Sequence, residues 1–379
     1  MLPSSVLLIA PYNPTPAGVE VYATEVATRL ARTGVRVEVI SYLESKKAGM
    51  ETVYRMPTVS LPLLRGLTFT ASASAAASIL SLLRGVDVVN AHYAVTSGVA
   101  VSLAKLRAPK VLTFHGSDVA LLKGVMRPLV PLLLSCTFYV AVSRRLACEL
   151  AALGFPRERI TVIPGGVDFK GLSSIAKIPR EEARRAVGLP VHARIILFMA
   201  PLIPYKNPLV LLPAFKKLVR SLQDTYLVYC GRGPLAREIL KEASGLKVGS
   251  RVALIPEVSR DKVPYVLRSA DVLVVPSTRE AWGLTVLEAM AVGTPVIVSR
   301  FAGVSDVLVN WRHAIVVNPH SCLELANAIK AILEDPSLAE YIVKRAISIA
   351  RKFTWELTAK RYLRLFTHIL GDASEKVQV

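Results

Sequence analysis

The sequence alternates short runs of β-branched and aliphatic residues with longer stretches in which apolar residues recur at the period of a helix. The short runs are apolar throughout and are bounded by turn residues, which is typical of strands buried on both faces of a sheet. Strands joined by crossover helices form parallel sheets. We therefore predict strands at 6–10, 35–41, 86–90, 110–114, 137–142 and 160–163, and again at 195–199, 226–230, 252–255, 272–276, 296–299 and 315–317, with helices at 19–32, 68–83, 97–106 and 144–153.

A turn-rich segment, Pro164-Gly165-Gly166-Val167-Asp168, separates the two series of strands. This break predicts an N-terminal Rossmann-like domain over residues 1–170 and a C-terminal one over 171–354. Residues 355–379 are predicted to form a last helix and tail that pack back on the N-terminal domain. Because ligands bind beyond the carboxyl ends of parallel strands, we expect the two domains to face a shared cleft.

Composition and charge narrow the class of protein. Of the 379 residues, 52% are hydrophobic and 20% are charged, so the chain can bury packed cores and lacks the signature of disorder. With 47 Lys and Arg against 28 Asp and Glu, its net charge is +19, which favours anionic partners. The cysteines Cys136, Cys148, Cys230 and Cys322 lie far apart, and we expect buried thiols rather than a metal site.

The sequence predicts neither export nor a membrane-spanning segment. Residues 1–5 lack a basic n-region, and the apolar run that follows is too short for a secretory signal. The most apolar stretch, 67–83, is uncharged but shorter than the roughly 20 residues that a spanning helix needs. We therefore expect a cytoplasmic location. The scarcity of glutamine and asparagine is typical of proteins from hot habitats.

In the first domain, two residues that follow predicted strands are candidates for contact with a ligand. Gly18 lies at the N-terminus of the helix predicted at 19–32, where N–H groups without intrahelical partners attract phosphate. His115 follows the strand at 110–114 and can donate a hydrogen bond to a substrate. An ordinary turn glycine and a structural histidine are the alternatives.

In the second domain, two carboxylates lie on either side of the start of a predicted helix. Glu280 lies in the loop before this helix and Glu288 lies on its first turns, so both can accept hydrogen bonds from sugar hydroxyls. The phosphates of the same ligand would rest on the N–H groups of Gly283, Leu284 and Thr285. A capped surface helix is the structural alternative.

The stretch from Glu280 to Glu288 resembles the signature of retaining glycosyltransferases of the GT-B fold, in the large family 4 group, in which seven residues separate two glutamates. The resemblance spans nearly the whole chain. Further stretches in register with the family are Ala17–Glu20, Thr113–Gly116, Ile163–Asp168, Leu202–Asn207, Gly231–Pro234, Ser269–Val272, Gly293–Ile297 and Gly303. The resemblance implies an α/β GT-B fold, with two Rossmann-like parallel-sheet domains facing a cleft and helices at the C-terminus.

This resemblance also implies a reaction and a set of roles. The family moves a sugar from a nucleotide diphosphate sugar, its donor substrate, to a hydroxyl acceptor. Lys206 should pair with the donor diphosphate, Glu288 should hold the nucleotide ribose, and Glu280 should hold hydroxyls of the donor sugar. His115 should support that sugar and not act as a nucleophile. Because Lys206 and the helix N-terminus would neutralise the leaving group, we expect neither a metal ion nor another cofactor.

The chain departs from the family at one position that matters for the donor. Five residues before Lys206, where the family usually has a diphosphate-binding Arg, this chain has Pro201. Arg232 is the candidate substitute for the missing cation. A milder departure lies in the first loop, where Ala17-Gly18 replaces a doubled glycine.

Two other hypotheses stay open on the sequence. One is a basic nucleic-acid-binding or membrane-binding protein on an inactive scaffold, and the other is an enzyme that epimerises or hydrolyses nucleotide sugars. The combination of Lys206, Glu280 and Glu288 speaks against the first, so no nucleic-acid partner is expected.

Apolar stretches with basic flanks predict a membrane partner. Residues 61–67 and 125–134 are apolar apart from Arg65 and Arg127, and two further basic residues, Arg55 and Lys123, lie nearby. This pattern predicts reversible docking on an anionic membrane, where the acceptor would be lipid-linked or a precursor of a cell-surface glycan. Core helices are the alternative for both stretches.

Overall fold

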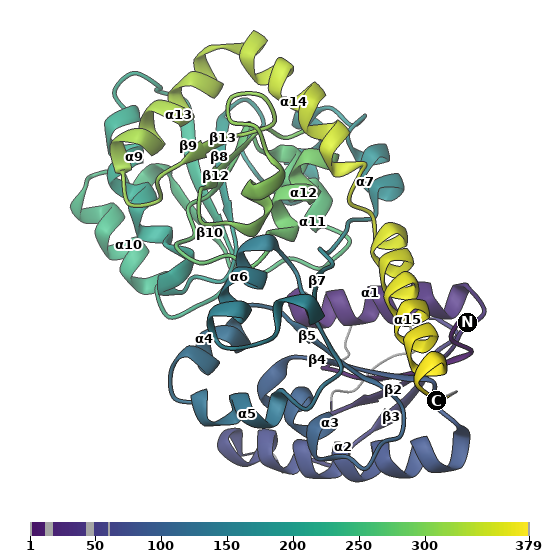
Figure 1. Cartoon of the computed structure of the whole chain (residues 1–379). Coiled ribbons are helices and arrows are strands. Elements are labelled where there is room, and N and C mark those ends of the chain that lie inside the picture. The colour runs from purple at the N-terminus through teal and green to yellow at the C-terminus, as the bar shows by residue number, and fades with distance from the viewer. Residues whose placement is uncertain (1, 12–17, 43–48, 60, 378–379) are drawn as a thin grey trace. The chain divides into compact units, whose positions relative to one another are not determined.

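The computed structural model describes residues 2–11, 18–42, 49–59 and 61–377. The chain divides into two compact units, of which unit 1 comprises residues 1–165 and 355–379 and unit 2 comprises residues 166–354. Each unit contains one parallel sheet with helices packed against it (Figure 1). The prediction of two Rossmann-like parallel-sheet domains is therefore confirmed.

Unit 1 is built on seven strands in the order β3-β2-β1-β4-β5-β6-β7, and every neighbouring pair is parallel. The central strands are buried on both faces, which explains their unbroken apolar runs. The strands are β1 (Ser5–Ile9), β2 (Arg36–Ser41), β3 (Thr52–Arg55), β4 (Val88–His92), β5 (Lys110–Phe114), β6 (Phe138–Ala141) and β7 (Ile160–Val162).

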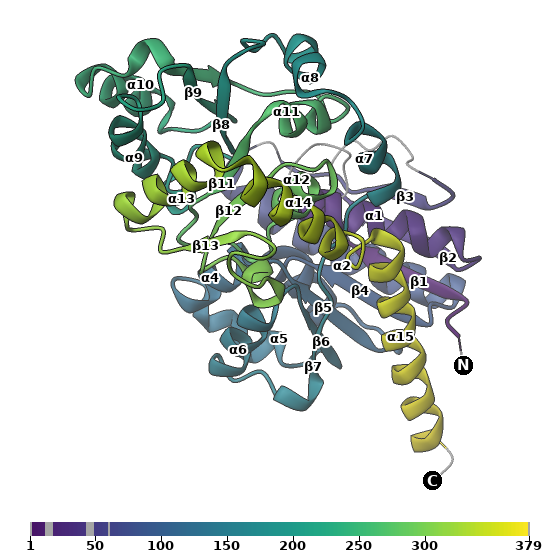
Figure 2. The same ribbon diagram turned by 90° about the horizontal axis from the view of Figure 1, so that it is seen from above.

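Seven α-helices are described in unit 1, including the last helix of the chain. In Figure 1, α15 crosses α1, and in Figure 2 the start of α15 lies next to α1; the two helices are in contact. The Thr358 hydroxyl near the start of α15 donates a hydrogen bond to the Pro164 carbonyl oxygen at 2.9 Å. The helices are α1 (Gly18–Arg32), α2 (Pro62–Arg84), α3 (Val99–Leu103), α4 (Ser117–Lys123), α5 (Val130–Leu133), α6 (Arg144–Ala152) and α15 (Trp355–Val377).

Two elements of unit 1 differ from the sequence prediction. The edge strand β3 is missed because its four residues, only partly buried, form no apolar run. The helix expected at 97–106 begins instead as a π-helical turn at 94–98 and ends at Leu103. Gly98 packs closely there, since a Cβ would lie 2.9 Å from the Leu112 side chain.

Unit 2 is built on six strands in the order β10-β9-β8-β11-β12-β13, again parallel throughout. Alternate strand residues such as Ile196, Phe198 and Leu227 form one core with α9, α10 and α13. The strands are β8 (Arg194–Met199), β9 (Thr225–Cys230), β10 (Val252–Ile255), β11 (Val272–Val275), β12 (Val296–Ser299) and β13 (Ile315–Val317). The helices are α7 (Phe169–Ile175), α8 (Arg180–Val187), α9 (Leu211–Leu218), α10 (Ala236–Gly245), α11 (Val263–Ser269), α12 (Leu284–Ala291), α13 (Cys322–Glu334) and α14 (Pro336–Ala350).

The prediction that all four cysteines are buried is wrong in part. Cys136 and Cys230 are buried and carry free thiols, and burial raises the pKa of each to about 11. Cys148 is exposed, because it lies on the outer face of the amphipathic helix α6, and Cys322 is only partly buried.

Candidate functional site

An ion pair in unit 2 joins two of the residues expected at the donor site. Lys206 ends a short turn after β8, and Glu280 lies in the loop after β11, the strand that pairs with β8. The Lys206 Nζ lies 2.5 Å from the Glu280 Oε2. The two side chains are only 14% and 18% exposed, so water screens their attraction weakly. The structure therefore brings this lysine and this glutamate together at the carboxyl edge of the sheet.

Main-chain hydrogen bonds fix the two loops that carry this ion pair. The N–H of Thr278 donates to the carbonyl oxygen of Tyr205 at 2.9 Å, which ties the loop after β11 to the turn after β8. The N–H of Gly303 donates to the carbonyl oxygen of Glu280 at 2.9 Å, which ties the same loop to the segment after β12. The pair thus projects from backbone that is held on both sides.

Helix α12 begins directly after this loop. Gly283 precedes it with a φ of 109°, a conformation that favours glycine and lets the chain turn sharply into the helix. The first N–H groups of a helix lack intrahelical partners, so those of Gly283, Leu284 and Thr285 are suited to receive a phosphate. Glu288 is partly buried and lies one turn further on, on the same helix face as Leu284.

The loop after β9 packs tightly against the loop after β8. A Cβ at Gly231 would lie 2.1 Å from the carbonyl oxygen of Ala200, and one at Gly233 would lie 2.2 Å from the carbonyl oxygen of Leu202. Both contacts are with main-chain atoms, which cannot move aside cheaply. This close approach is the physical reason for two glycines separated by one residue.

Arg232, between those glycines, lies in contact with the loop that carries Pro201. The carbonyl oxygen of Arg232 accepts a hydrogen bond from the N–H of Leu202 at 2.8 Å. Its side chain is 72% exposed and pairs with Glu257, with 3.0 Å between Nε and Oε2. The structure therefore puts a cation close in the fold to the site of the missing Arg, but one that already has a carboxylate partner.

In unit 1, His115 lies at the carboxyl end of β5, where the backbone is fixed by a buried aspartate. The Asp118 carboxylate accepts hydrogen bonds from the main-chain N–H groups of Ala94 (3.0 Å), His115 (3.1 Å) and Gly116 (2.8 Å). Burial raises the pKa of Asp118, and these main-chain hydrogen bonds oppose that rise. The sequence analysis does not single out Asp118, although an acidic residue at the start of a helix just after a glycine turn is a recognisable signal.

The surroundings of His115 keep its imidazole neutral. Burial lowers the pKa of His115 from 6.5 to about 3. Its Nε2 lies 3.2 Å from the Nδ1 of His92, and its ring packs edge-on against Tyr22 with 5.0 Å between centroids. Burial, followed by the nearby His115, also lowers the pKa of His92 well below 6.5. This pair therefore supplies hydrogen bonds rather than positive charge at neutral pH.

Gly18 is the first residue of α1 and is exposed. A Cβ at Gly18 would meet no described atom within 4 Å, so the described residues give no steric reason for a glycine there. The rest of the expected phosphate loop, including Ala17, lies in 12–17, outside the described residues. Gly18 and His115 belong to unit 1, whereas Lys206, Glu280, the N-terminus of α12 and Glu288 belong to unit 2.

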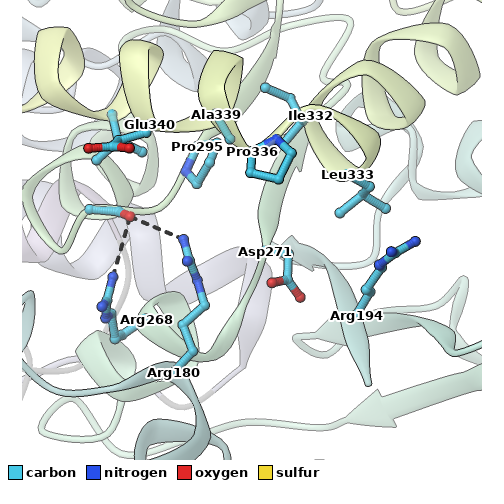
Figure 3. A pocket seen from close by; sticks show the side chains of 12 residues that line it. Arg180, Arg194, Arg268, Asp271, Pro295, Ile332, Leu333, Pro336, Ala339 and Glu340 are labelled. Atoms are coloured by element: carbon cyan, nitrogen blue, oxygen red, sulfur yellow. Dashed lines mark hydrogen bonds between the residues drawn. The ribbon is translucent and has the colours of Figure 1, made fainter. Parts of the chain in front are cut away.

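A cavity of about 330 Å³ lies at the other edge of the sheet of unit 2 (Figure 3). Its lining includes Arg194, the first residue of β8, and Asp271, just before β11, so it lies at the amino edge of the sheet. The guanidinium groups of Arg180 and Arg268 donate to the Gly293 carbonyl oxygen at 3.3 and 3.5 Å (Figure 3). These arginines thus satisfy a carbonyl group just beyond α12, and none of the expected donor-site residues lines this cavity.

Unit 2 therefore combines a cation, two carboxylates and the first N–H groups of α12 beyond two neighbouring strands, β8 and β11. Such a set can bind a ligand that carries both phosphate and hydroxyl groups. Within the described part of the chain, no three His, Cys, Asp or Glu side chains are grouped so as to hold a metal ion.

Sequence comparisons place known families on both units. The family model described as "Glycosyl transferases group 1" matches residues 179–348, and "Glycosyltransferase Family 4" matches residues 16–170. A D-inositol 3-phosphate glycosyltransferase from Thermobispora bispora is 30% identical, over 96% of this chain and 92% of its own.

Solved structures agree in fold. A sucrose-phosphate synthase from Thermosynechococcus elongatus has a TM-score of 0.81 at 20% identity, covering 97% of this chain and 100% of its own. HepE from Anabaena, solved in complex with UDP-glucose, has a TM-score of 0.77 at 18% identity, covering 96% of this chain and 99% of its own. These likenesses show a GT-B fold.

Proposed function

Since this chain belongs to the group 1 and family 4 glycosyltransferases, we propose that it is a hexosyltransferase that uses a nucleotide diphosphate sugar and retains the anomeric configuration. The observation that carries the proposal is the Lys206–Glu280 ion pair followed by the N-terminus of α12. A sugar diphosphate presents an anion next to hydroxyl groups, and this arrangement places a cation next to a carboxylate. HepE, of the same fold, binds UDP-glucose, which supports a UDP-sugar as the first donor to try.

In the proposed reaction the bond between the anomeric carbon and the phosphate oxygen breaks. The acceptor oxygen forms its bond to the anomeric carbon on the same face, and the acceptor proton passes to the departing phosphate oxygen. Negative charge grows on the diphosphate during this step. Lys206 and the N–H groups of Gly283, Leu284 and Thr285 would stabilise it without any rearrangement, so we propose that neither a metal ion nor a cofactor is needed.

In this proposal the two carboxylates and the histidine form hydrogen bonds with the uncharged parts of the donor, its sugar and its ribose. Glu280 accepts hydrogen bonds from hydroxyls of the sugar, while its pairing with Lys206 keeps the lysine aimed at the diphosphate. Glu288, one turn into α12, accepts hydrogen bonds from the ribose hydroxyls. His115, neutral at physiological pH, supports the donor sugar by a hydrogen bond.

A donor screen followed by product analysis tests this function. A nucleotide sugar that binds the native protein raises its melting temperature, so a panel of nucleotide sugars identifies the donor. Incubation with that donor and a panel of hydroxyl acceptors, inositol phosphate and lipid-linked sugars included, should give a glycoside whose anomeric configuration matches that of the donor. An inverted product contradicts retention. Epimerised or hydrolysed donor, with no glycoside formed, would support the competing enzyme class.

We also propose that unit 1 docks reversibly on the anionic cytoplasmic face of a membrane, which would present a lipid-linked acceptor. Helix α2 exposes Leu64, Leu67, Ile79 and Leu82 to solvent. Its segment 64–84 is long and apolar enough to cross a membrane by length and composition, so the sequence argument that this region is too short does not hold for the full helix.

Packing nevertheless favours a surface position for α2. Phe69, Ala73 and Ala77 recur every four residues and are buried, and α2 contacts α3 and β2 of unit 1. The helix therefore has one face committed to the fold and one apolar face exposed. Of the second predicted stretch, Val125 is exposed, whereas Val130 and Leu133 are buried in unit 1, so the alternative of a core helix holds for that part.

The charge of this region suits an anionic surface. Between residues 52 and 148 the sequence has ten Lys and Arg and only two acidic residues. Of those two, Asp87 accepts hydrogen bonds from Ser4, and Asp118 is fully buried. Each basic residue near an acidic bilayer contributes roughly 1 kcal/mol, although the pairing of Lys123 with Glu149 reduces its share.

Co-sedimentation with lipid vesicles tests the docking proposal. The protein should bind vesicles that contain anionic lipid, and the binding should fade as salt rises. Leu67→Asp on the exposed face of α2 should weaken binding, whereas Leu240→Asp, at an exposed leucine of α10 in unit 2, should not. Equal recovery of the wild-type protein in the supernatant with neutral and anionic vesicles rejects docking.

A further inference from the structure

A chain of buried polar side chains connects the last helix of the protein to His115. Tyr362 on α15 and Thr113 on β5 have hydroxyl oxygens 2.9 Å apart, and the Thr113 hydroxyl donates to the Asn90 Oδ1 at 3.1 Å. The Asn90 amide nitrogen lies 3.1 Å from the His92 Nε2, and the His92 Nδ1 lies 3.2 Å from the His115 Nε2. The first four of these residues have no exposed surface.

Every hydrogen bond in this series of side chains is donated in the same direction, from Tyr362 toward His115. Because the Asn90 Oδ1 accepts from Thr113, the amide N–H₂ faces His92 and donates to its Nε2. A neutral imidazole that accepts at Nε2 carries its proton on Nδ1, so His92 donates from Nδ1 to the Nε2 of His115. By the same rule His115 carries its proton on Nδ1.

The hydroxyl of a second tyrosine, Tyr22, lies beside that of Tyr362. Tyr22 donates its hydroxyl proton to the Ile163 carbonyl oxygen at 2.7 Å, and the hydroxyl oxygens of Tyr22 and Tyr362 are 3.3 Å apart. Since the Thr113 proton is committed to Asn90, Tyr362 is the donor in its contact with Thr113. Burial also raises the pKa of Tyr362, so its hydroxyl keeps this proton at neutral pH.

The series of hydrogen-bonded side chains ends at Nδ1 of His115, the ring nitrogen that faces away from His92. His115 is partly exposed, and its Nδ1 makes no hydrogen bond with any residue that the structure describes. A neutral Nδ1–H group can donate to a sugar or phosphate oxygen, whereas the other tautomer would only accept a hydrogen bond. The direction of these hydrogen bonds thus determines whether Nδ1 of His115 donates to a ligand oxygen or accepts a hydrogen bond from the ligand.

We propose that Tyr362, Thr113, Asn90 and His92 form a positioning relay that holds His115 in its Nδ1–H tautomer, so that unit 1 offers a hydrogen-bond donor to an oxygen of the bound ligand. The relay gives the last helix a role in the site, because α15 supplies the hydroxyl at which the relay begins. The identity of the ligand as a nucleotide sugar rests on the proposed function, whereas the tautomer does not.

Nitrogen NMR of the full-length protein tests the tautomer without any substrate. The protein has six histidines, and after ¹⁵N-histidine labelling a two-bond proton–nitrogen spectrum at pH 7 distinguishes Nδ1–H from Nε2–H rings. A His115→Gln variant assigns the His115 signals by their loss. We expect a single Nδ1–H form for both His92 and His115. An Nε2–H form of His115, or a mixture of tautomers in the wild-type protein, overturns the proposal.

Removing the hydroxyl that orients Asn90 tests the relay itself. Thr113→Val keeps the shape of the side chain but frees the amide to turn, so we expect a second His115 tautomer and an approximately tenfold lower kcat/KM for transfer. The control is Thr225→Val in β9 of unit 2, which removes a buried hydroxyl that has no hydrogen-bond partner among the described residues. An unchanged His115 spectrum in folded Thr113→Val overturns the relay.

A second variant covers the case in which Thr113→Val does not fold. Tyr362→Phe removes the first donor, and we expect a smaller population of the second His115 tautomer. Its control is Tyr139→Phe, another fully buried tyrosine of unit 1, whose hydroxyl donates to the Cys136 carbonyl oxygen at 3.0 Å and is not part of the relay. Equal His115 spectra in the two tyrosine variants contradict the proposal. Lack of any transferase activity in the wild-type protein would instead count against the proposed function and leave the spectra unchanged.

Discussion

Unit 2 places an ion pair at the carboxyl edge of its sheet, whereas unit 1 places a pair of neutral histidines there. In unit 2, Lys206 and Glu280 form an ion pair that keeps some access to solvent. In unit 1, His92 and His115 are held by burial with pKa values far below 6.5, so both rings are uncharged. A deeply buried charge costs several kcal/mol unless it is compensated, and the neutral His92 and His115 avoid that cost. The buried Asp118 beside them is instead compensated by hydrogen bonds from main-chain N–H groups.

This difference determines how each region responds to substitution. In unit 2 the property proposed to bind the donor is charge, which each residue carries by itself. In unit 1 the proposed property is the direction of a hydrogen bond, which would depend on a series of buried neighbours back to Tyr362. Substitutions in unit 2 should therefore act locally, whereas those in unit 1 should act over several residues.

The largest effect on activity is expected from substitutions in the charged region of unit 2, which consists of Lys206, Glu280 and Glu288. Lys206→Ala and Glu288→Ala should each lower kcat/KM by about two orders of magnitude, because each removes a charged group that would contact the donor. Glu280→Ala should have a similar effect, since it removes the acceptor for sugar hydroxyls and the partner of Lys206. Steady-state kinetics with the donor found in the screen, together with circular dichroism to check folding, measure this.

A lysine outside the candidate site provides the matched control. Lys344 on α14 also pairs with a glutamate, Glu340, at 2.7 Å, but on the surface. Exposed pairs of this kind contribute about 0–1 kcal/mol, so Lys344→Ala should leave turnover unchanged. Near-normal turnover of Lys206→Ala or Glu288→Ala would remove the donor site from this edge of unit 2.

The charged region is also the one that the sequence predicts better. Glu280, Gly283 and Glu288 lie in one continuous stretch after an apolar run, so their order along the chain is nearly their order in space. The glycines at 231 and 233 are found from the family resemblance, but the reason for them, contact with the backbone after β8, needs coordinates.

The relay of unit 1 is not predictable from the sequence by the same means. Thr113 and Tyr362 are 249 residues apart, and only the return of α15 to unit 1 brings them together. Asn90 and His92 belong to a strand predicted at 86–90 that lies at 88–92, so His92 is missed as a strand residue. Periodicity finds which residues are buried, but the pairing of buried polar groups depends on strand order and register.

Acid should destabilise unit 1 through its buried histidines. An unfolded histidine binds a proton below its ordinary pKa of about 6.5, whereas native His92 stays neutral well below that pH. The free energy of unfolding should therefore fall as pH drops below 6.5, by up to about 1.4 kcal/mol per pH unit for this residue, and should not change through it above 6.5. Native His115 adds to the fall between 6.5 and about 3.

Urea unfolding at pH 7, 6 and 5 measures this dependence. His92→Phe should be less stable at pH 7 but should lose part of the slope with pH, because one proton-binding group is gone. His192→Phe, at an exposed histidine of unit 2, should keep the wild-type slope. Identical slopes for His92→Phe and the wild-type protein would show that His92 is not buried in its neutral form.

A smaller effect, on donor binding, is expected at Pro201, where the family usually has an Arg. Pro201→Arg restores the family's usual charge, and a new hydrogen-bonded cation next to the diphosphate should tighten donor binding by up to about tenfold. Calorimetric titration with the nucleoside diphosphate measures it, with Pro201→Gln as the uncharged control of similar length. If Arg232 already serves this purpose, Arg232→Ala will weaken binding and Pro201→Arg will give no gain.

The smallest expected effect is that of removing divalent metal ions. If unit 2 neutralises the diphosphate with Lys206 and the N-terminus of α12, the positive charge needed at the leaving group is built into the chain. Transferase activity should then be the same with excess EDTA as with added Mg²⁺ or Mn²⁺.

Lys206→Ala sharpens the test, because a metal ion can supply a positive charge that the variant lacks. Partial rescue of this variant by Mg²⁺, together with EDTA-resistant wild-type activity, is the expected pattern. Loss of wild-type activity in EDTA and its return with Mg²⁺ would show that the charged region needs a metal ion to complete it.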